Sequence, residues 1–165
     1  MNYLGLKIET LDVSTTAAII SIAAVVFTKE SGITDSFHIN ISSDQKSYGR
    51  TVSNDTVKFI KGLPDDIKKQ ISSDRVDLPY ALNALSHFIK SKNVKLYPCS
   101  FNSLFDIAIL KSAYETCEID LGFNVFNVID IRTIYTLTKT INNYKMVHNP
   151  LTDITGICNE FINLI

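Results

Sequence analysis

The chain has no tryptophan, and only 3 cysteines, 2 methionines, 4 prolines and 6 glycines among its 165 residues. Cys99, Cys117 and Cys158 are odd in number and widely spaced, so they do not suggest a metal-binding pair. They suit a reducing cytoplasm as small buried apolar residues. The chain also lacks an apolar run of membrane length and a basic segment before its first apolar run. We therefore expect a cytoplasmic protein with no membrane partner.

Charge of one sign does not dominate either. The 16 Lys and Arg residues face 17 Asp and Glu residues, which gives a formal net charge of -1. This balance argues against a broad basic surface for duplex nucleic acid, although it allows a small binding site. With 45% apolar and 20% charged residues, the composition is that of an ordinary globular chain. The length predicts one domain over residues 1–165 with a substantial core.

The first quarter of the chain predicts a three-stranded antiparallel meander. An apolar run at 3–6 leads into Lys7-Ile8-Glu9-Thr10, and a second apolar run covers 17–27. With a polar turn near 12–16 between them, they are typical of a hairpin of buried strands. Rough alternation over 33–41 predicts the third strand, and the polar stretch 42–53 predicts a loop.

The rest of the chain alternates helices with short strands. Ser53 is a potential N-cap for the first helix, because its hydroxyl can accept a free backbone N–H. Expected helices cover 55–61, 67–71, 77–92, 102–116, 131–138 and 152–164, and expected strands cover 94–98 and 126–130. This order predicts an α/β fold in which helices flank a mixed sheet.

Three separated stretches carry the residues of chemical interest. Glu9 lies near the end of the first strand, Asp106 in the first turns of a helix, and His148 five residues before Asp153 at the last helix. Each acid has a simpler explanation, either an edge-strand glutamate in water or an acid favoured by a helix dipole. Together, three carboxylates and a histidine match two-metal phosphoryl chemistry, in which Mg²⁺ or Mn²⁺ activates water and the imidazole takes its proton.

The chain resembles the ribonuclease H-like 3'-5' exonucleases of the DEDD type that carry a histidine in the last motif. It is most similar to the small phage exonuclease A and mycobacterial exoribonuclease-like group. Five ordered segments over nearly the whole chain carry the likeness, which one short motif would not. They are Lys7-Ile8-Glu9-Thr10, the segments 49–56 and 102–110, Asp130-Ile131-Arg132-Thr133, and the segment 148–153. The resemblance implies a ribonuclease H-like mixed sheet.

The resemblance also implies roles for individual residues. Glu9, Asp106 and Asp153 would hold metal, and His148 would be the general base. Thr10, Asn102 and Phe59 would contact substrate, with Phe59 standing where relatives carry tryptophans and stacking on a base. Phe59 has an alternative role as a core residue of its short helix. Tyr48 and Arg50 either touch a 3'-terminal strand or are solvated loop residues.

Lys7 departs from the family pattern. It stands where the family places the aspartate that bridges both metals, and no other acid lies two residues before Glu9. At ~4 Å and an effective dielectric constant of ~20, a like-charge pair costs about 4 kcal/mol, and more for a divalent ion. We expect this repulsion to leave one metal ion or none, and the ammonium to pair with Glu9 or Asp153 in place of a metal. Asp12, in the turn, is a poor substitute ligand.

Three hypotheses follow. In the first, which we favour, an exonuclease fold has lost two-metal hydrolysis and binds a single-stranded DNA or RNA 3' end, a nucleotide or a protein. In the second, the chain is an active 3'-5' exonuclease with one metal. In the third, it is an interaction protein of a phage or mobile element that acts on a host factor. Active relatives often pair, so a homodimer is compatible with each hypothesis.

Overall fold

The computed structural model describes residues 1–165 and contains one five-stranded mixed sheet of order β3-β2-β1-β4-β5. Three long strands form an antiparallel meander: β1 (Asn2–Thr10), β2 (Ile19–Thr28) and β3 (Gly32–Asn40). Two short strands, β4 (Leu96–Ser100) and β5 (Ile129–Asp130), extend the sheet in parallel with β1. The predicted architecture of a meander plus short parallel strands is confirmed.

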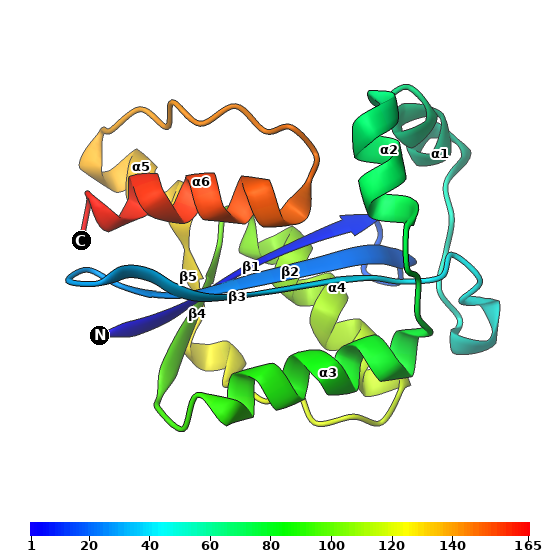
Figure 1. The fold of residues 1–165 in the computed structure, drawn as a ribbon, viewed down its shortest axis with the longest axis horizontal. Coiled ribbons are helices and arrows are strands. Elements are labelled where there is room, and N and C mark those ends of the chain that lie inside the picture. The colour runs from blue at the N-terminus through cyan, green and yellow to red at the C-terminus, as the bar shows by residue number, and fades with distance from the viewer.

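Helices cover both faces of this sheet (Figure 1). They are α1 (Asn54–Lys61), α2 (Asp65–Ser72), α3 (Leu78–Ser91), α4 (Ser103–Thr116), α5 (Ile131–Thr138) and α6 (Pro150–Ile162). Two 3-10 turns, η1 (Lys46–Tyr48) and η2 (Val125–Asn127), lie in the connections. Figure 1 shows α5 and α6 on one face, α3 and α4 on the other, and α1 and α2 beyond the carboxyl end of β1. None of the helices combines the length and the apolar content that a membrane-spanning helix needs.

The two faces of β1 bury different side chains, because successive residues of a strand point to opposite sides. Leu4, Leu6 and Ile8 belong to the cluster packed with α3 and α4. Tyr3 belongs to the cluster packed with α5 and α6. Burial on both faces explains why β1 and β2 read as continuous apolar runs rather than alternating ones.

Gly5 allows α6 to lie close to β1. A Cβ at this position would be 2.5 Å from Cys158 Sγ of α6 and 2.9 Å from Val25 Cγ2 of β2. Cys158 and Cys99 are buried as predicted, whereas Cys117 is only partly buried. The close approach of α6 brings its first turn next to the carboxyl end of β1.

Several predicted boundaries are wrong by a few residues. The strand expected over 94–98 is Leu96–Ser100, and the one expected over 126–130 is reduced to Ile129–Asp130, because the 3-10 turn η2 precedes it. The last helix begins at Pro150 rather than at 152, since the Asn149 side chain caps it and proline suits a first turn. Ser53 occupies the N-cap position of α1, but its hydroxyl makes no capping hydrogen bond.

Arg50 is a structural residue, and the interpretation of it as a solvated loop side chain is wrong. Its side chain is buried and donates hydrogen bonds to Ala17 O at 3.0 Å and to Ser112 Oγ at 2.9 Å. It also donates to the carbonyl oxygens of Thr15 and Ile109. The guanidinium therefore ties the connection between β1 and β2 to α4.

Candidate functional site

The predicted site residues gather at the carboxyl end of β1. Lys7 and Glu9 are two residues apart in β1, so they share the face that α6 covers. Asp106 lies in the first turn of α4 and Asp153 in the first turn of α6. Because β4 runs parallel to β1 and leads into α4, Asp106 arrives at the same edge of the sheet.

The ammonium of Lys7 lies between two of the predicted metal ligands. Its Nζ is 3.3 Å from Glu9 Oε1 and 3.8 Å from Asp106 Oδ1, and it donates a hydrogen bond to Ile8 O at 2.8 Å. The predicted pairing with Glu9 is confirmed, but the second partner is Asp106 rather than Asp153. Glu9 Oε1 is buried and makes no hydrogen bond, so its contact with Lys7 is ionic only.

Burial and charge act in opposite directions on these groups. Burial lowers the pKa of Lys7, but the charges of Asp106 and Glu9 outweigh it, and the net pKa is raised. Burial raises the pKa of both carboxyl groups, and Lys7 offsets only part of this. Lys7 is therefore an ammonium at neutral pH, whereas the two acids hold protons to higher pH than exposed ones do.

Asp153 is fully buried, and donors of the chain itself surround it. Its Oδ1 accepts hydrogen bonds from the Val147 N–H at 2.8 Å and from the Tyr144 hydroxyl at 2.9 Å. Its Oδ2 accepts one from the His148 N–H at 3.0 Å. Tyr144 is a site residue that the sequence does not predict, since its one signal there is an aromatic residue within a polar loop.

Asp106 is bound in a similar way. Its Oδ1 accepts the Ile8 N–H at 3.2 Å, and its Oδ2 accepts the Ser100 hydroxyl at 2.9 Å. These bonds join α4 to β1 and β4. Asn102, the residue before α4, accepts the Asp106 N–H with its backbone oxygen at 2.9 Å.

His148 faces Phe59 across the opening of the site. The two rings meet edge to face with centroids 4.9 Å apart. His148 has a φ of +62°, in the left-handed region, and Phe59 is 50% exposed. The interpretation of Phe59 as a core residue is therefore wrong, and its ring is available to a ligand.

A cavity of about 360 Å³ opens beside Lys7. Polar or charged groups contribute part of the lining, and Val13, Phe59, Phe105 and Met146 contribute apolar surface. The lining residues are Lys7, Ile8, Glu9, Thr10, Val13, Asp55, Thr56, Phe59, Ile60, Phe105, Met146 and His148. Of the predicted site residues, Asp106, Asp153 and Asn102 do not line it.

The side chains present do not fit a two-metal centre. No three His, Cys, Asp or Glu side chains lie close enough together to hold a metal ion. The ammonium of Lys7 lies between Glu9 and Asp106, and Asp153 accepts three hydrogen bonds from the Tyr144 hydroxyl and the 147–148 backbone. Asp12 does not replace a ligand, because its carboxylate accepts hydrogen bonds from Val13 and Ser14 of its own turn and from the Thr51 hydroxyl.

Solved structures show which class of fold this is. The nuclease domain of 3'hExo, a DEDDh family member bound to rAMP, matches with a TM-score of 0.67 at 12% identity, over 99% of this chain and 90% of that one. E. coli exonuclease I in complex with a dT13 oligonucleotide matches with a TM-score of 0.71 at 10% identity, over 99% of this chain and 40% of that one. The chain thus has the ribonuclease H-like fold of DEDDh exonucleases, although it spans less than half of exonuclease I.

The sequence identifies the family more narrowly. Residues 2–156 match the model of the Rv2179c-like 3'-5' exoribonuclease domain, and the chain belongs to this family. No curated protein sequence matches it significantly. The exonuclease lineage inferred from the five motif segments is confirmed.

Proposed function

We propose that this protein is a degenerate 3'-5' exonuclease that binds a single-stranded 3' end or a nucleotide without efficient hydrolysis. The position of Lys7 carries the proposal, because its Nζ lies 3.3 Å from Glu9 and 3.8 Å from Asp106. In active two-metal sites, the metals turn water into a nucleophile and stabilise the leaving oxygen. An ammonium has no open coordination position, so it does not turn a bound water into a nucleophile as a metal does.

The same charge disfavours a divalent ion at this position. A dication about 4 Å from the ammonium would be repelled by about 8 kcal/mol at an effective dielectric constant of ~20. Asp153 does not compensate, because three hydrogen-bond donors already hold its two oxygens. The electrostatics therefore support loss of the two-metal reaction while the fold remains intact.

Several features support a retained binding function. The cavity beside Lys7 offers the exposed ring of Phe59, and aromatic faces stack on bases of any sequence. The related nuclease domain of 3'hExo was solved with rAMP, and exonuclease I with dT13. Glu9 lines the cavity, and because burial raises its pKa, we expect phosphate-bearing ligands to bind more tightly as the pH falls.

A degradation assay on 3'-terminated single-stranded RNA and DNA with Mg²⁺ or Mn²⁺ tests the proposal. The wild-type chain should leave the strands intact, and calorimetry should detect no Mn²⁺ binding at this site. Lys7→Asp should gain Mn²⁺ binding, whereas the neutral control Lys7→Asn should gain less. Wild-type turnover that disappears in Asp106→Asn would refute the proposal.

One observation favours an active one-metal exonuclease as the second candidate. Glu9 Oε1 is a buried acceptor that makes no hydrogen bond, and its ionic partner is the Lys7 ammonium at 3.3 Å, so a metal ion could bind this oxygen only by displacing that ammonium. The same calorimetry separates the candidates. One Mn²⁺ bound by the wild type and lost in Glu9→Gln, together with strand shortening, would establish the second candidate.

A further inference from the structure

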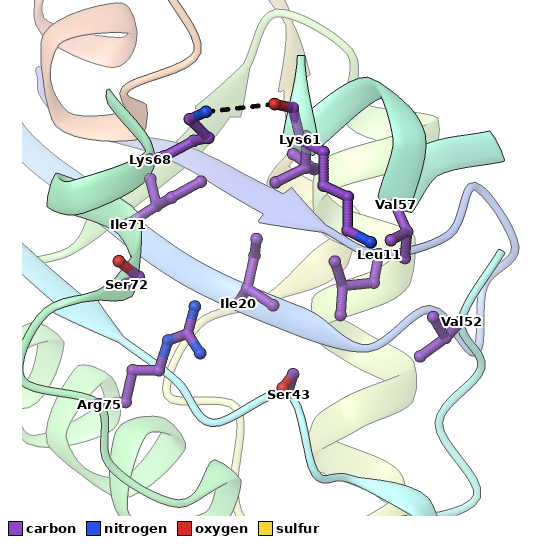
Figure 2. A pocket seen from close by; sticks show the side chains of 11 residues that line it. Leu11, Ile20, Ser43, Val52, Val57, Lys61, Lys68, Ile71, Ser72 and Arg75 are labelled. Atoms are coloured by element: carbon purple, nitrogen blue, oxygen red, sulfur yellow. Dashed lines mark hydrogen bonds between the residues drawn. The ribbon is translucent and has the colours of Figure 1, made fainter. Parts of the chain in front are cut away.

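A second cavity, of about 510 Å³, is lined by residues of β2, α1 and α2 and of the connections next to them (Figure 2). Its floor is aliphatic and is made by Leu11, Ile20, Val52, Val57, Ile60 and Ile71. Polar residues from the 43–75 region complete the rim. Ile60 lines both cavities, so α1 is the wall between them. A volume of this size is typical of pockets that hold a small ligand or a group of side chains.

The charged residues at this second cavity are all cations. They are Lys61, Lys68 and Arg75, and no acid lines the cavity. Lys68 is engaged within the chain, with its Nζ 2.7 Å from Asp65 and 3.3 Å from Lys61 O. Lys61 and Arg75 form no ion pair. Figure 2 shows their side chains reaching toward the floor from opposite sides.

The lining restricts the chemistry of the occupant. Single-stranded nucleic acid is held by stacking of its bases on aromatic rings, and no aromatic residue lines this cavity. An aliphatic floor instead accepts an apolar side chain, and two free cations on the rim attract carboxylates. The charge complement is therefore an acidic segment that carries one large apolar residue.

We propose that this cavity binds an acidic peptide segment of a protein partner. A large apolar side chain of the peptide fills the aliphatic floor, and flanking carboxylates pair with Lys61 and Arg75. This site is distinct from the nucleic-acid site beside Lys7, and its occupation requires neither metal nor nucleotide.

The position of α1 gives the binding event a route to the first site. No residue of α1 is buried, so this helix has little support from the core. A peptide in the second cavity would contact Val57 and Ile60, the two α1 side chains that line its floor. The same helix carries Phe59 against His148. A bound peptide would therefore restrict the movement of α1 and of Phe59 in the cavity beside Lys7.

Selection from a displayed random-peptide library tests the proposal. The intact wild-type protein is the bait, and Ser72→Trp, whose indole would cover the cavity from the rim, is the counter-selection. Enriched peptides should carry at least two Asp or Glu residues around one Leu, Ile, Phe or Met. Their affinity, measured by fluorescence anisotropy without metal or nucleic acid, should fall about tenfold in Lys61→Glu or Arg75→Glu, equivalent to ~1.4 kcal/mol. It should also weaken with salt.

Lys69→Glu is the matched control, because Lys69 is exposed on α2 but lines neither cavity. It should leave peptide affinity nearly unchanged, and thermal melting should show that every variant is folded. Methyl NMR signals of Val57 and Ile60 should shift when peptide binds.

Three results would overturn the proposal: no peptide that distinguishes wild type from Ser72→Trp, enriched peptides without acidic residues, or equal losses in Lys69→Glu. Loss of dT-oligonucleotide binding in Lys61→Glu, without peptide binding, would assign the cavity to nucleic acid instead. The peptide assay contains no nucleic acid. Its failure would therefore not bear on the proposed binding of a 3' end or a nucleotide beside Lys7.

Discussion

The hydroxyl of Tyr144 donates a hydrogen bond to Asp153 Oδ1 at 2.9 Å, and this contact fixes the loop that carries His148. The Tyr144 ring packs over Gly156 of α6, where an added Cβ would overlap it. The N–H groups of Val147 and His148 bind the same carboxylate. In this structure Asp153 therefore anchors a loop, although its place in the motif implies a metal ligand.

Asp153→Asn should lower the free energy of unfolding by about 1–3 kcal/mol, because the amide NH₂ would face N–H donors in a fully buried position. Urea denaturation measures this loss, and hydrogen exchange should show faster exchange at Val147 and His148. Asp66→Asn is the control, since Asp66 is also a first-turn acid but is exposed. Equal effects of the two substitutions would contradict the anchoring role.

The charge of Lys7 predicts a stability difference that changes with pH. Glu9 and Asp106 have raised pKa values, so folding takes up protons, and their contribution weakens as pH rises from their ordinary values of 4.5 and 3.8. The charge of Lys7 limits how far the pKa values of Glu9 and Asp106 are raised. Lys7→Met removes this charge, so the free energy of unfolding should fall more steeply as the pH rises. The contribution of Lys7 itself is present below 10.5 and is lost above its raised pKa.

Near pH 7, Lys7→Met should be less stable than wild type by about 3–5 kcal/mol, as for one broken partner of a buried ion pair. At pH values where both acids are protonated, the difference should vanish or reverse, because the wild type then buries an unpaired ammonium. Urea denaturation over a pH series that begins below 3.8, the ordinary pKa of the Asp106 carboxyl, and ends at pH 8 measures both limits, with Lys69→Met as the exposed control. Parallel curves for wild type and Lys7→Met would show that Lys7 is not coupled to the two acids.

The sequence predicts where the charged site residues lie in the fold, but not which groups they contact. Alternation in β1 places Lys7 and Glu9 on one face, and the motif order correctly predicts Asp106 and Asp153 at the first turns of α4 and α6. The partner of Lys7 depends on how closely α4 and α6 approach the sheet, which no local pattern encodes.

The same limit explains two other misses. The donors to Asp153 are backbone groups next to a residue with positive φ, His148, and such geometry has no reliable signature in a single sequence. Arg50 looks like a loop cation, but its buried hydrogen bonds depend on carbonyl groups of residues distant in the chain. In both cases the hydrogen-bond partners are backbone atoms of other segments of the chain. Such partners depend on the three-dimensional fold and cannot be inferred from the residue types.

Phe59→Ala should weaken binding of a short single-stranded oligonucleotide by about 1–3 kcal/mol, the usual contribution of one base stacked on an aromatic ring. Its effect on unfolding should be small, because the ring is 50% exposed and α1 has no buried residue. Fluorescence anisotropy with 5'-labelled RNA and DNA measures the affinity. Phe126→Ala is the matched control, since Phe126 is 93% exposed and lines no cavity. Unchanged affinity in Phe59→Ala would remove this residue from the proposed binding surface.

Gly5 sets the distance between α6 and β1, and thereby the position of Asp153 relative to Lys7. Gly5→Ala should lower the free energy of unfolding by about 1–3 kcal/mol, because its Cβ would overpack the core. The nearest atom would be Cys158 Sγ at 2.5 Å, followed by Val25 Cγ2 at 2.9 Å and Ile154 Cγ1 at 3.1 Å. Removing the sulfur in Cys158→Ala should relieve the first contact but not the other two.

A double-mutant cycle therefore measures whether the contact of Gly5 with α6 limits the packing. Gly5→Ala should cost less in the Cys158→Ala background than in wild type, with a coupling of about 0.5–3 kcal/mol between residues in contact. Cys117→Ala is the control background, because Cys117 is only partly buried and belongs to the opposite face. Additive costs with Cys158→Ala would show that the contact of Gly5 with Cys158 does not limit the approach of α6 to β1.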